Sequence, residues 1–112
     1  MRLYEVPLFD MTIYAGADYH LTVTYSEDDI HPIDMNGWSV EATLRRFAES
    51  NNGMYFRCGA DAEGIHLHLT SAQTAMLDYL YGVYDVWIID PENNLRVKFI
   101  EGRAFVEKNI IR

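Results

Sequence analysis

Cysteine and basic residues are scarce in this chain of 112 residues. Cys58 is the one cysteine, so no internal disulfide can form and the fold is compatible with a reducing compartment. Nine Lys and Arg stand against 17 Asp and Glu, which gives a net charge of −8. Because the few basic residues are also dispersed, a phosphate backbone would be repelled, and we expect no nucleic-acid partner. The acidic balance suits solubility, or contact with a basic partner surface.

Long apolar runs and catalytic motifs are also lacking. No apolar stretch reaches the length of a membrane-spanning helix, so we expect no membrane partner. Residues 1–10 have neither the basic start nor the cleavage site of a signal peptide, and we expect the mature chain to begin near Met1. No set of nucleophile, base and oxyanion donors stands out, which predicts no enzyme activity, no catalytic residues and no cofactor.

The chain does have strand periodicity. Its residues are 49% hydrophobic and 13% aromatic, enough for one domain with a core. Within the stretch 64–90, apolar and polar residues alternate at 65–69 and again at 84–88, which predicts two strands. Between them, Thr70 and Gln73 have the spacing of a capping box, which predicts a short helix that stops at Gly82.

The remaining chain reads as short strands separated by turns. Strands are predicted at 11–14, 19–25, 38–47, 54–58 and from 95 onward, with one of the turns at 59–64. In the last strand the apolar positions change from odd to even between Phe99 and Ala104, so we expect a β-bulge near Glu101 and Gly102.

About eight strands and one helix predict an all-β fold. The pattern favours an immunoglobulin-like antiparallel β-sandwich of residues 11–112, in which the helix connects the two sheets. Tyr84, near the start of a strand, is interpreted either as a tyrosine corner or as a plain core residue. Residues 1–10 form an N-terminal arm in which Pro7 argues against a central strand. This arm forms a terminal edge strand, folds back onto its own core or lies across a neighbouring molecule.

Two histidines raise the question of a metal. His66 and His68 lie on the same face of one predicted strand, a spacing that can place two imidazoles on one ion. A third ligand is not evident from the sequence, and His20 and His31 are not placed by it. We therefore interpret His66 and His68 as exposed strand histidines and predict no metal site.

Several apolar residues are predicted to face outward, where water contact is unfavourable. Either the face assignment slips by one residue, or the arm or another chain covers that sheet. The eight tyrosines and two tryptophans either fill the core or mark an interface. The candidate interface residues are Leu3, Tyr4, Val6, Leu8, Phe9, Val83, Trp87, Ile89, Ile100 and Phe105.

A family resemblance rests on five short motifs. They are Gly-Ala-Asp at 16–18, Pro-Ile-Asp-Met-Asn-Gly at 32–37, the helix motif at 69–75, Gly-Val-Tyr-Asp at 82–85 and the closing Glu-Gly-Arg-Ala-Phe-Val at 101–106. Together they resemble a recurrent bacteriophage virion β-sandwich over about Met11 to Val106.

The resemblance implies a structural role without enzyme activity. It implies a small adaptor or decoration subunit that is made in the bacterial host cytoplasm and docks on a tail, baseplate or capsid assembly. The partners would be other virion structural proteins, with the chain itself present as a homo-oligomer or in several symmetric copies. The alternative is a carbohydrate- or host-surface-binding module in which Tyr and Trp side chains stack on the ligand.

Overall fold

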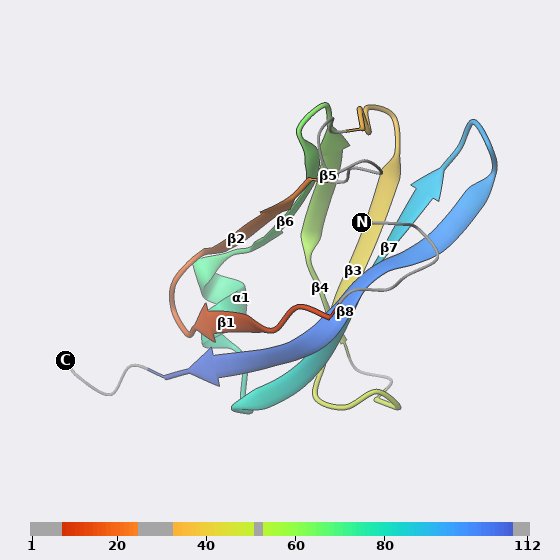
Figure 1. Ribbon diagram of the computed structural model, residues 1–112. Coiled ribbons are helices and arrows are strands. Elements are labelled where there is room, and N and C mark those ends of the chain that lie inside the picture. Colours follow the sequence, from red (N-terminus) through yellow and green to blue (C-terminus); the bar gives the residue numbers. More distant parts are fainter. Residues whose placement is uncertain (1–7, 25–32, 51–52, 109–112) are drawn as a thin grey trace.

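The computed structural model describes residues 8–24, 33–50 and 53–108, and eight strands and one helix lie within them (Figure 1). The elements are β1 Met11–Tyr14, β2 Tyr19–Val23, β3 Ser39–Arg45, β4 Gly53–Tyr55, β5 Arg57–Asp61, β6 Gly64–Leu69, α1 Ser71–Ala75, β7 Tyr81–Asp90 and β8 Leu95–Glu107. The strand–helix–strand order predicted for the stretch 64–90 is therefore confirmed as β6, α1 and β7.

The strands form two facing sheets, which confirms the all-β sandwich (Figure 1). The larger sheet has the order β1-β8-β7-β3-β4, and the smaller has the order β2-β6-β5. The third strand thus pairs with β7, which in turn pairs with β8, while the second strand sits in the opposite sheet, as in immunoglobulin domains. One pairing corrects the antiparallel expectation, because β1 runs parallel to β8. Parallel pairing is possible here since most of the chain separates these two strands.

The space between the sheets holds an apolar core. The predicted alternation is confirmed in β6, where Ile65, Leu67 and Leu69 are fully buried. The buried apolar residues are Met11, Ile13, Met35, Ala42, Leu44, Phe56, Ile65, Leu67, Leu69, Leu77, Tyr84, Val86, Ile88, Phe99, Ile100, Ala104 and Val106. Burial of this apolar surface is the main source of stability for a fold without disulfides.

The strand predicted at 54–58 is two strands in the structure. β4 pairs with β3 in the larger sheet, whereas β5 pairs with β6 in the smaller one. Between them Phe56 is buried, and its backbone N donates to the carbonyl oxygen of Ala42 at 3.0 Å. The chain therefore crosses from one sheet to the other at Phe56. Because β5 continues to Asp61, the predicted turn at 59–64 is shorter and lies at residues 62–63.

The predicted capping box of α1 is confirmed. Gln73 N donates to Thr70 Oγ1 at 3.2 Å, and Thr70 N donates to Gln73 Oε1 at 2.9 Å. The hydroxyl of buried Thr74 donates to the carbonyl oxygen of Ala17 at 2.9 Å, which ties α1 to the β1–β2 turn. The helix does not extend to Gly82 as predicted. It ends at Ala75, and Gly82 lies inside β7. A Cβ there would lie 2.6 Å from the Arg45 carbonyl oxygen, so close strand packing explains this glycine.

The predicted bulge exists but lies earlier in β8. Val86 is opposite Ile100 while the next residue, Trp87, is opposite Lys98, so Phe99 is the additional residue. Phe99 and Ile100 are both buried, with Ile100 only 4% exposed. The outward assignment of Ile100 was therefore wrong. The reason is the position of the bulge. The additional residue lies before Ile100, so the side chain of Ile100 points to the core side of the sheet and not to the outer side.

The described part of the N-terminal arm lies along β8. Leu8 forms a parallel bridge with Glu101, and Phe9 N donates to the Glu101 carbonyl oxygen at 3.0 Å. Asp10 then pairs with Arg103 at 2.7 Å, before β1 begins. The end of the arm thus extends an edge strand of its own sheet, one of the expected arrangements. The other predicted arm contacts, Leu3, Tyr4 and Val6, lie outside the described residues.

Tyr84 connects the arm to the core. It lies opposite Gly102, and its hydroxyl donates to the Phe9 carbonyl oxygen at 2.5 Å. A tyrosine corner would bond to backbone a few residues upstream, so Tyr84 is instead a core tyrosine bonded to the arm. An aromatic ring beside a cross-strand glycine covers the surface that the glycine leaves open.

Substitution of Gly102 should release the arm. A Cβ at this position would collide with the Phe9 carbonyl oxygen, a backbone atom that cannot move alone. We expect Gly102→Ala to lower the free energy of unfolding by about 1–3 kcal/mol in urea denaturation. Gly59→Ala is the control, since a Cβ there meets no atom within 4 Å. Equal stability of the two variants would contradict the close contact between the arm and β8.

Tyr19 and Tyr84, two of the tyrosines whose pKa is raised by burial, should make the fold sensitive to alkali. Burial raises the pKa of Tyr19 to about 12 and also raises the pKa of Tyr84. In the unfolded chain the tyrosine hydroxyls lose their protons near pH 10, while in the folded chain they keep them. The stabilisation that the two tyrosines give the folded state is therefore complete below about pH 9 and is lost as pH rises through 10 toward 12. Urea denaturation between pH 8 and pH 11 measures the decline. We expect Tyr84→Phe to make it shallower, and Tyr55→Phe, at a ring 70% exposed, to change it less.

Candidate functional site

Four of the predicted contact residues lie on the outer surface of the larger sheet. Val83, Trp87 and Ile89 of β7 alternate with the buried Tyr84, Val86 and Ile88, so they point away from the core. Phe105 is likewise half-buried between the buried Ala104 and Val106 of β8, and its ring packs against Tyr81 with centroids 5.8 Å apart. We call the surface formed by Val83, Trp87, Ile89 and Phe105 the Trp87 face.

Charged side chains cover part of the Trp87 face. The Arg96 guanidinium carbon lies 4.2 Å from the centroid of the Trp87 ring, and Lys98 Nζ lies 5.5 Å from it. Arg96 in turn pairs with Glu41 at 3.4 Å. A cation over an indole is attracted by the ring's negative face, and the arginine stem shields the ring from water. The face is therefore a mixture of apolar rings and ion pairs, and half-buried in the isolated chain.

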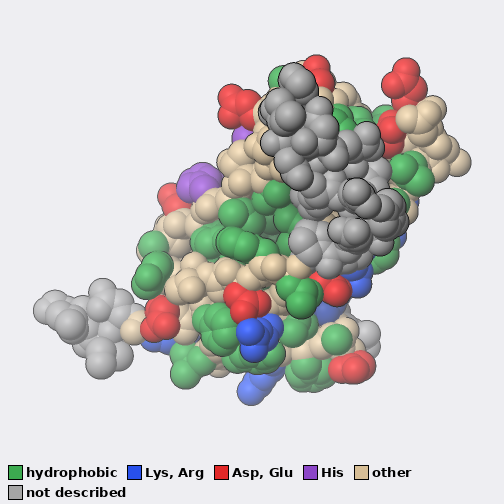
Figure 2. All heavy atoms as spheres, viewed as in Figure 1, with side chains coloured by type: hydrophobic (Ala, Val, Ile, Leu, Met, Phe, Trp, Pro, Cys, Tyr) green, Lys and Arg blue, Asp and Glu red, His purple; other side chains and the backbone are tan. Residues whose placement is uncertain are grey.

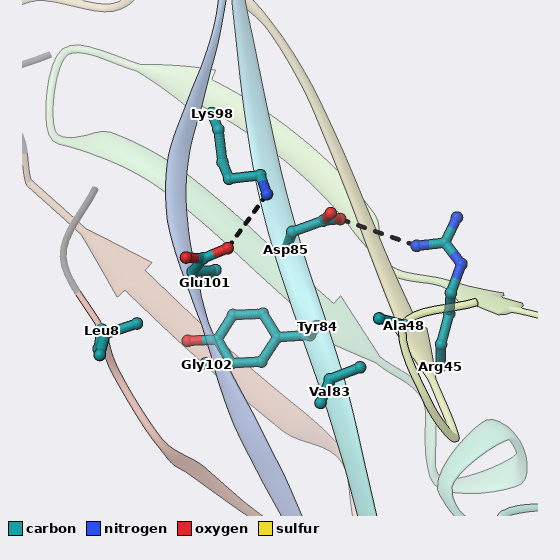
Figure 3. Close-up of a pocket in the computed structure, with 9 residues that line it drawn as sticks. All are labelled: Leu8, Arg45, Ala48, Val83, Tyr84, Asp85, Lys98, Glu101 and Gly102. Atoms are coloured by element: carbon teal, nitrogen blue, oxygen red, sulfur yellow. Dashed lines mark hydrogen bonds and ion pairs between the residues drawn. The ribbon is translucent and has the colours of Figure 1, made fainter. Parts of the chain in front are cut away.

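A shallow hollow of about 320 Å³ adjoins this face (Figure 3). It lies between the arm, β8 and β7, and the two carboxylates in it are paired: Asp85 with Arg45 at 3.9 Å and Glu101 with Lys98 at 3.1 Å. The lining residues are Leu8, Arg45, Ala48, Val83, Tyr84, Asp85, Lys98, Glu101 and Gly102. The described residues of the lining include no serine, cysteine, threonine or histidine. That the protein is not an enzyme stays a prediction.

An apolar groove runs between the arm and the edge of β2. It is lined by Leu8, Phe9, Leu21, Thr22, Val23, Thr24 and Ile100. Figure 2 shows hydrophobic side chains gathered beside this edge. Leu8 is 77% exposed, so the two predicted arm contacts that the structure describes, Leu8 and Phe9, are both accessible. Leu21 and Val23 of β2 alternate with exposed residues and pack against the core, as strand alternation predicts, and sequence reasoning missed only that they also line this groove.

The three described histidines lie on the outer surface of the smaller sheet, and Figure 2 shows histidine side chains there beside carboxylates. His66 Nε2 is 2.8 Å from Asp61 Oδ2, and His66 Nδ1 is 3.0 Å from Thr22 Oγ1. The hydrogen bond with His66 holds the pKa of the Asp61 carboxyl below its ordinary value. His68 instead stacks on His20, with ring centroids 4.2 Å apart. The structure therefore does not bring His66 and His68 to one site, and His31 lies outside the described residues.

These features define the class of the protein as an all-β sandwich with immunoglobulin-like strand order and two chemically different outer surfaces. No protein-family model matches the chain, and no curated protein sequence matches it. No helix among the described residues has the length and hydropathy to span a membrane. The resemblance to bacteriophage virion proteins accordingly stays a prediction from the sequence.

The cation above Trp87 should control access to the indole. We expect Arg96→Ala to increase quenching of tryptophan fluorescence by the neutral quencher acrylamide, because the ring loses its covering guanidinium. Arg57→Ala removes an exposed arginine from β5 in the other sheet and should leave quenching unchanged. If both variants behave like the original chain, the stacking of Arg96 on Trp87 does not persist in solution.

Proposed function

We propose that this protein is a non-enzymatic structural component of a bacteriophage virion. In this role it is a small adaptor or decoration subunit that docks on a larger tail, baseplate or capsid assembly. Its partners are other virion structural proteins, and it is present in several symmetric copies. The observation that carries the proposal is the combination of an immunoglobulin-like sandwich with the Trp87 face, an outer surface that alternates large apolar side chains with ion pairs.

The motifs behind the family resemblance occupy places where the fold needs them, which supports the proposal. Gly16 and Gly37 both have positive φ, at 90° and 86°, in the turns before β2 and β3. The motif at 69–75 forms the capped helix between the sheets. The closing motif at 101–106 pairs with the arm and with β1. A sequence pattern in which each part has a structural reason is better evidence of a shared fold than composition alone.

The Trp87 face has the composition of a docking surface. Protein interfaces are enriched in aromatic residues and arginine, and their centres exclude water around a few anchoring side chains. Trp87 is such an anchor, with Arg96 and Lys98 able to exchange their contacts with the ring for contacts with carboxylates of a partner. Elsewhere the net charge of −8 favours a partner surface that carries excess basic residues.

The alternative of a carbohydrate-binding module is less well supported at Trp87. Sugar recognition by stacking needs an aromatic ring with an open face, and Arg96 already occupies one face of Trp87. A sugar bound at that face would have to displace the guanidinium and its pairing with Glu41. A glycan array probed at high protein concentration examines this alternative directly, and strong glycan binding would count against the structural role.

The test measures incorporation of the chain into virions. Mass spectrometry of virions purified from a culture that encodes this chain should find it in several copies per particle. We expect Trp87→Ala to reduce the copy number and to weaken association tenfold or more, about 1.4 kcal/mol, while it lowers the free energy of unfolding by less.

Tyr55→Ala is the matched control, because Tyr55 is an exposed aromatic residue of β4 outside the Trp87 face. We expect this variant to incorporate normally. Absence of the chain from virions, together with a strict monomer in light scattering, would refute the proposed function. An equal loss of stability and association in Trp87→Ala would refute the assignment of the Trp87 face as the docking surface.

A further inference from the structure

Three potential metal ligands converge on the outer surface of the smaller sheet. His20 of β2 and His68 of β6 are directly opposite each other in the antiparallel pair, and Asp18 lies just before β2. One ligand atom from each of the three side chains lies within 4.8 Å of the others. Directly opposite residues of antiparallel strands have their Cβ atoms about 4.5–5.5 Å apart, so the sheet itself holds the two imidazoles together.

The hydrogen bonding of His68 is incomplete. Its Nε2 atom is buried, although the side chain as a whole is 28% exposed, and this atom has no hydrogen-bond partner in the described part of the chain. Nε2 lies 3.9 Å from Asp18 Oδ1, too far for a hydrogen bond. A buried polar atom without a partner costs free energy unless an ion or water satisfies it. In the tautomer with its proton on Nδ1, His68 therefore has a lone pair on Nε2 available to a metal ion beside Asp18.

The carboxylate of Asp18 is held in position by the start of α1. Ser71 N donates to Asp18 Oδ1 at 2.7 Å, and Oδ2 has no hydrogen bond to the described residues. A backbone donor that orients a carboxylate is the usual outer-shell support of a metal ligand. Asp18 can thus offer one oxygen to an ion while the other stays bound to the helix.

His66 does not belong to this group, although it is on the same strand face as His68. Both of its ring nitrogens already lie within hydrogen-bond distance of a partner, Nε2 with Asp61 and Nδ1 with Thr22. It therefore provides a natural internal control two residues from His68.

We propose that Asp18, His20 and His68 bind one divalent transition-metal ion of the kind that prefers imidazole, with Zn²⁺ as the first choice. Two imidazoles and one carboxylate suit zinc and its neighbours, whereas calcium and magnesium prefer oxygen ligands alone. Three protein ligands leave a fourth position to water or to a group from a partner molecule. This site lies on the opposite sheet from the Trp87 face and does not depend on the proposed function.

Binding requires a small local rearrangement. The two rings are stacked with only 5° between their planes, but the nitrogen lone pairs lie in those planes. With zinc–nitrogen bonds of about 2.0–2.1 Å, ligand atoms of a tetrahedral site approach to roughly 3.4 Å, so the rings must tilt and close on the ion. The exposed side chain of His20 has room to do this.

The experiment titrates the metal-free full chain with zinc chloride after treatment with a chelator. Isothermal titration calorimetry should give one ion per chain, and saturating Zn²⁺ should raise Tm by roughly 5–10 °C, an effect that excess chelator reverses. We expect Asp18→Asn, His20→Asn and His68→Asn each to weaken binding tenfold or more. His66→Asn is the matched control and should bind as the original chain does.

Nuclear magnetic resonance of the original chain provides a second measurement that needs no variant to fold. Zn²⁺ should shift the ring signals of His20 and His68 and leave those of His66 in place. No heat and no shifts at millimolar Zn²⁺ would overturn the proposal. An equal loss of affinity in His66→Asn, or several ions bound per chain, would show adventitious surface binding and would overturn it as well.

Discussion

The contact of Tyr84 with the N-terminal arm is the interaction on which the edge of the larger sheet depends. The ring lies opposite Gly102, and its hydroxyl reaches the carbonyl oxygen of Phe9. A side chain at position 102 would occupy the place of that carbonyl group, so glycine is required for the arm to lie against β8. The arm then continues as β1, and its parallel pairing with β8 covers what would otherwise be an open sheet edge.

The sandwich separates two kinds of chemistry because each sheet turns only one face to the core. The outer surface of the larger sheet combines apolar side chains with ion pairs around Trp87, which suits contact with another protein. The outer surface of the smaller sheet brings imidazoles and carboxylates together, which suits a cation. The proposed association and the proposed metal binding can therefore be tested independently by substitutions on opposite sides of the same core.

Much of the fold could be predicted, but the candidate sites could be predicted only in part. The alternation in β6 and β7 and the capping box of α1 were predicted correctly, since each depends on residues a few positions apart. The bulge of β8 was predicted two residues too late, which reversed the facing of Ile100. The pairing of His20 with His68 was missed, because two strands distant in sequence become neighbours only in the sheet.

The sequence by itself determined the strand periodicity, the helix start and the outward position of Val83, Trp87, Ile89 and Phe105. These properties arise from local backbone geometry and from the partition of apolar side chains into a core. Only the tertiary structure decided the crossing between sheets at Phe56, the parallel pairing of β1 and the convergence of Asp18 with two histidines. These depend on strand register and on contacts between distant segments, which a periodic pattern leaves unspecified.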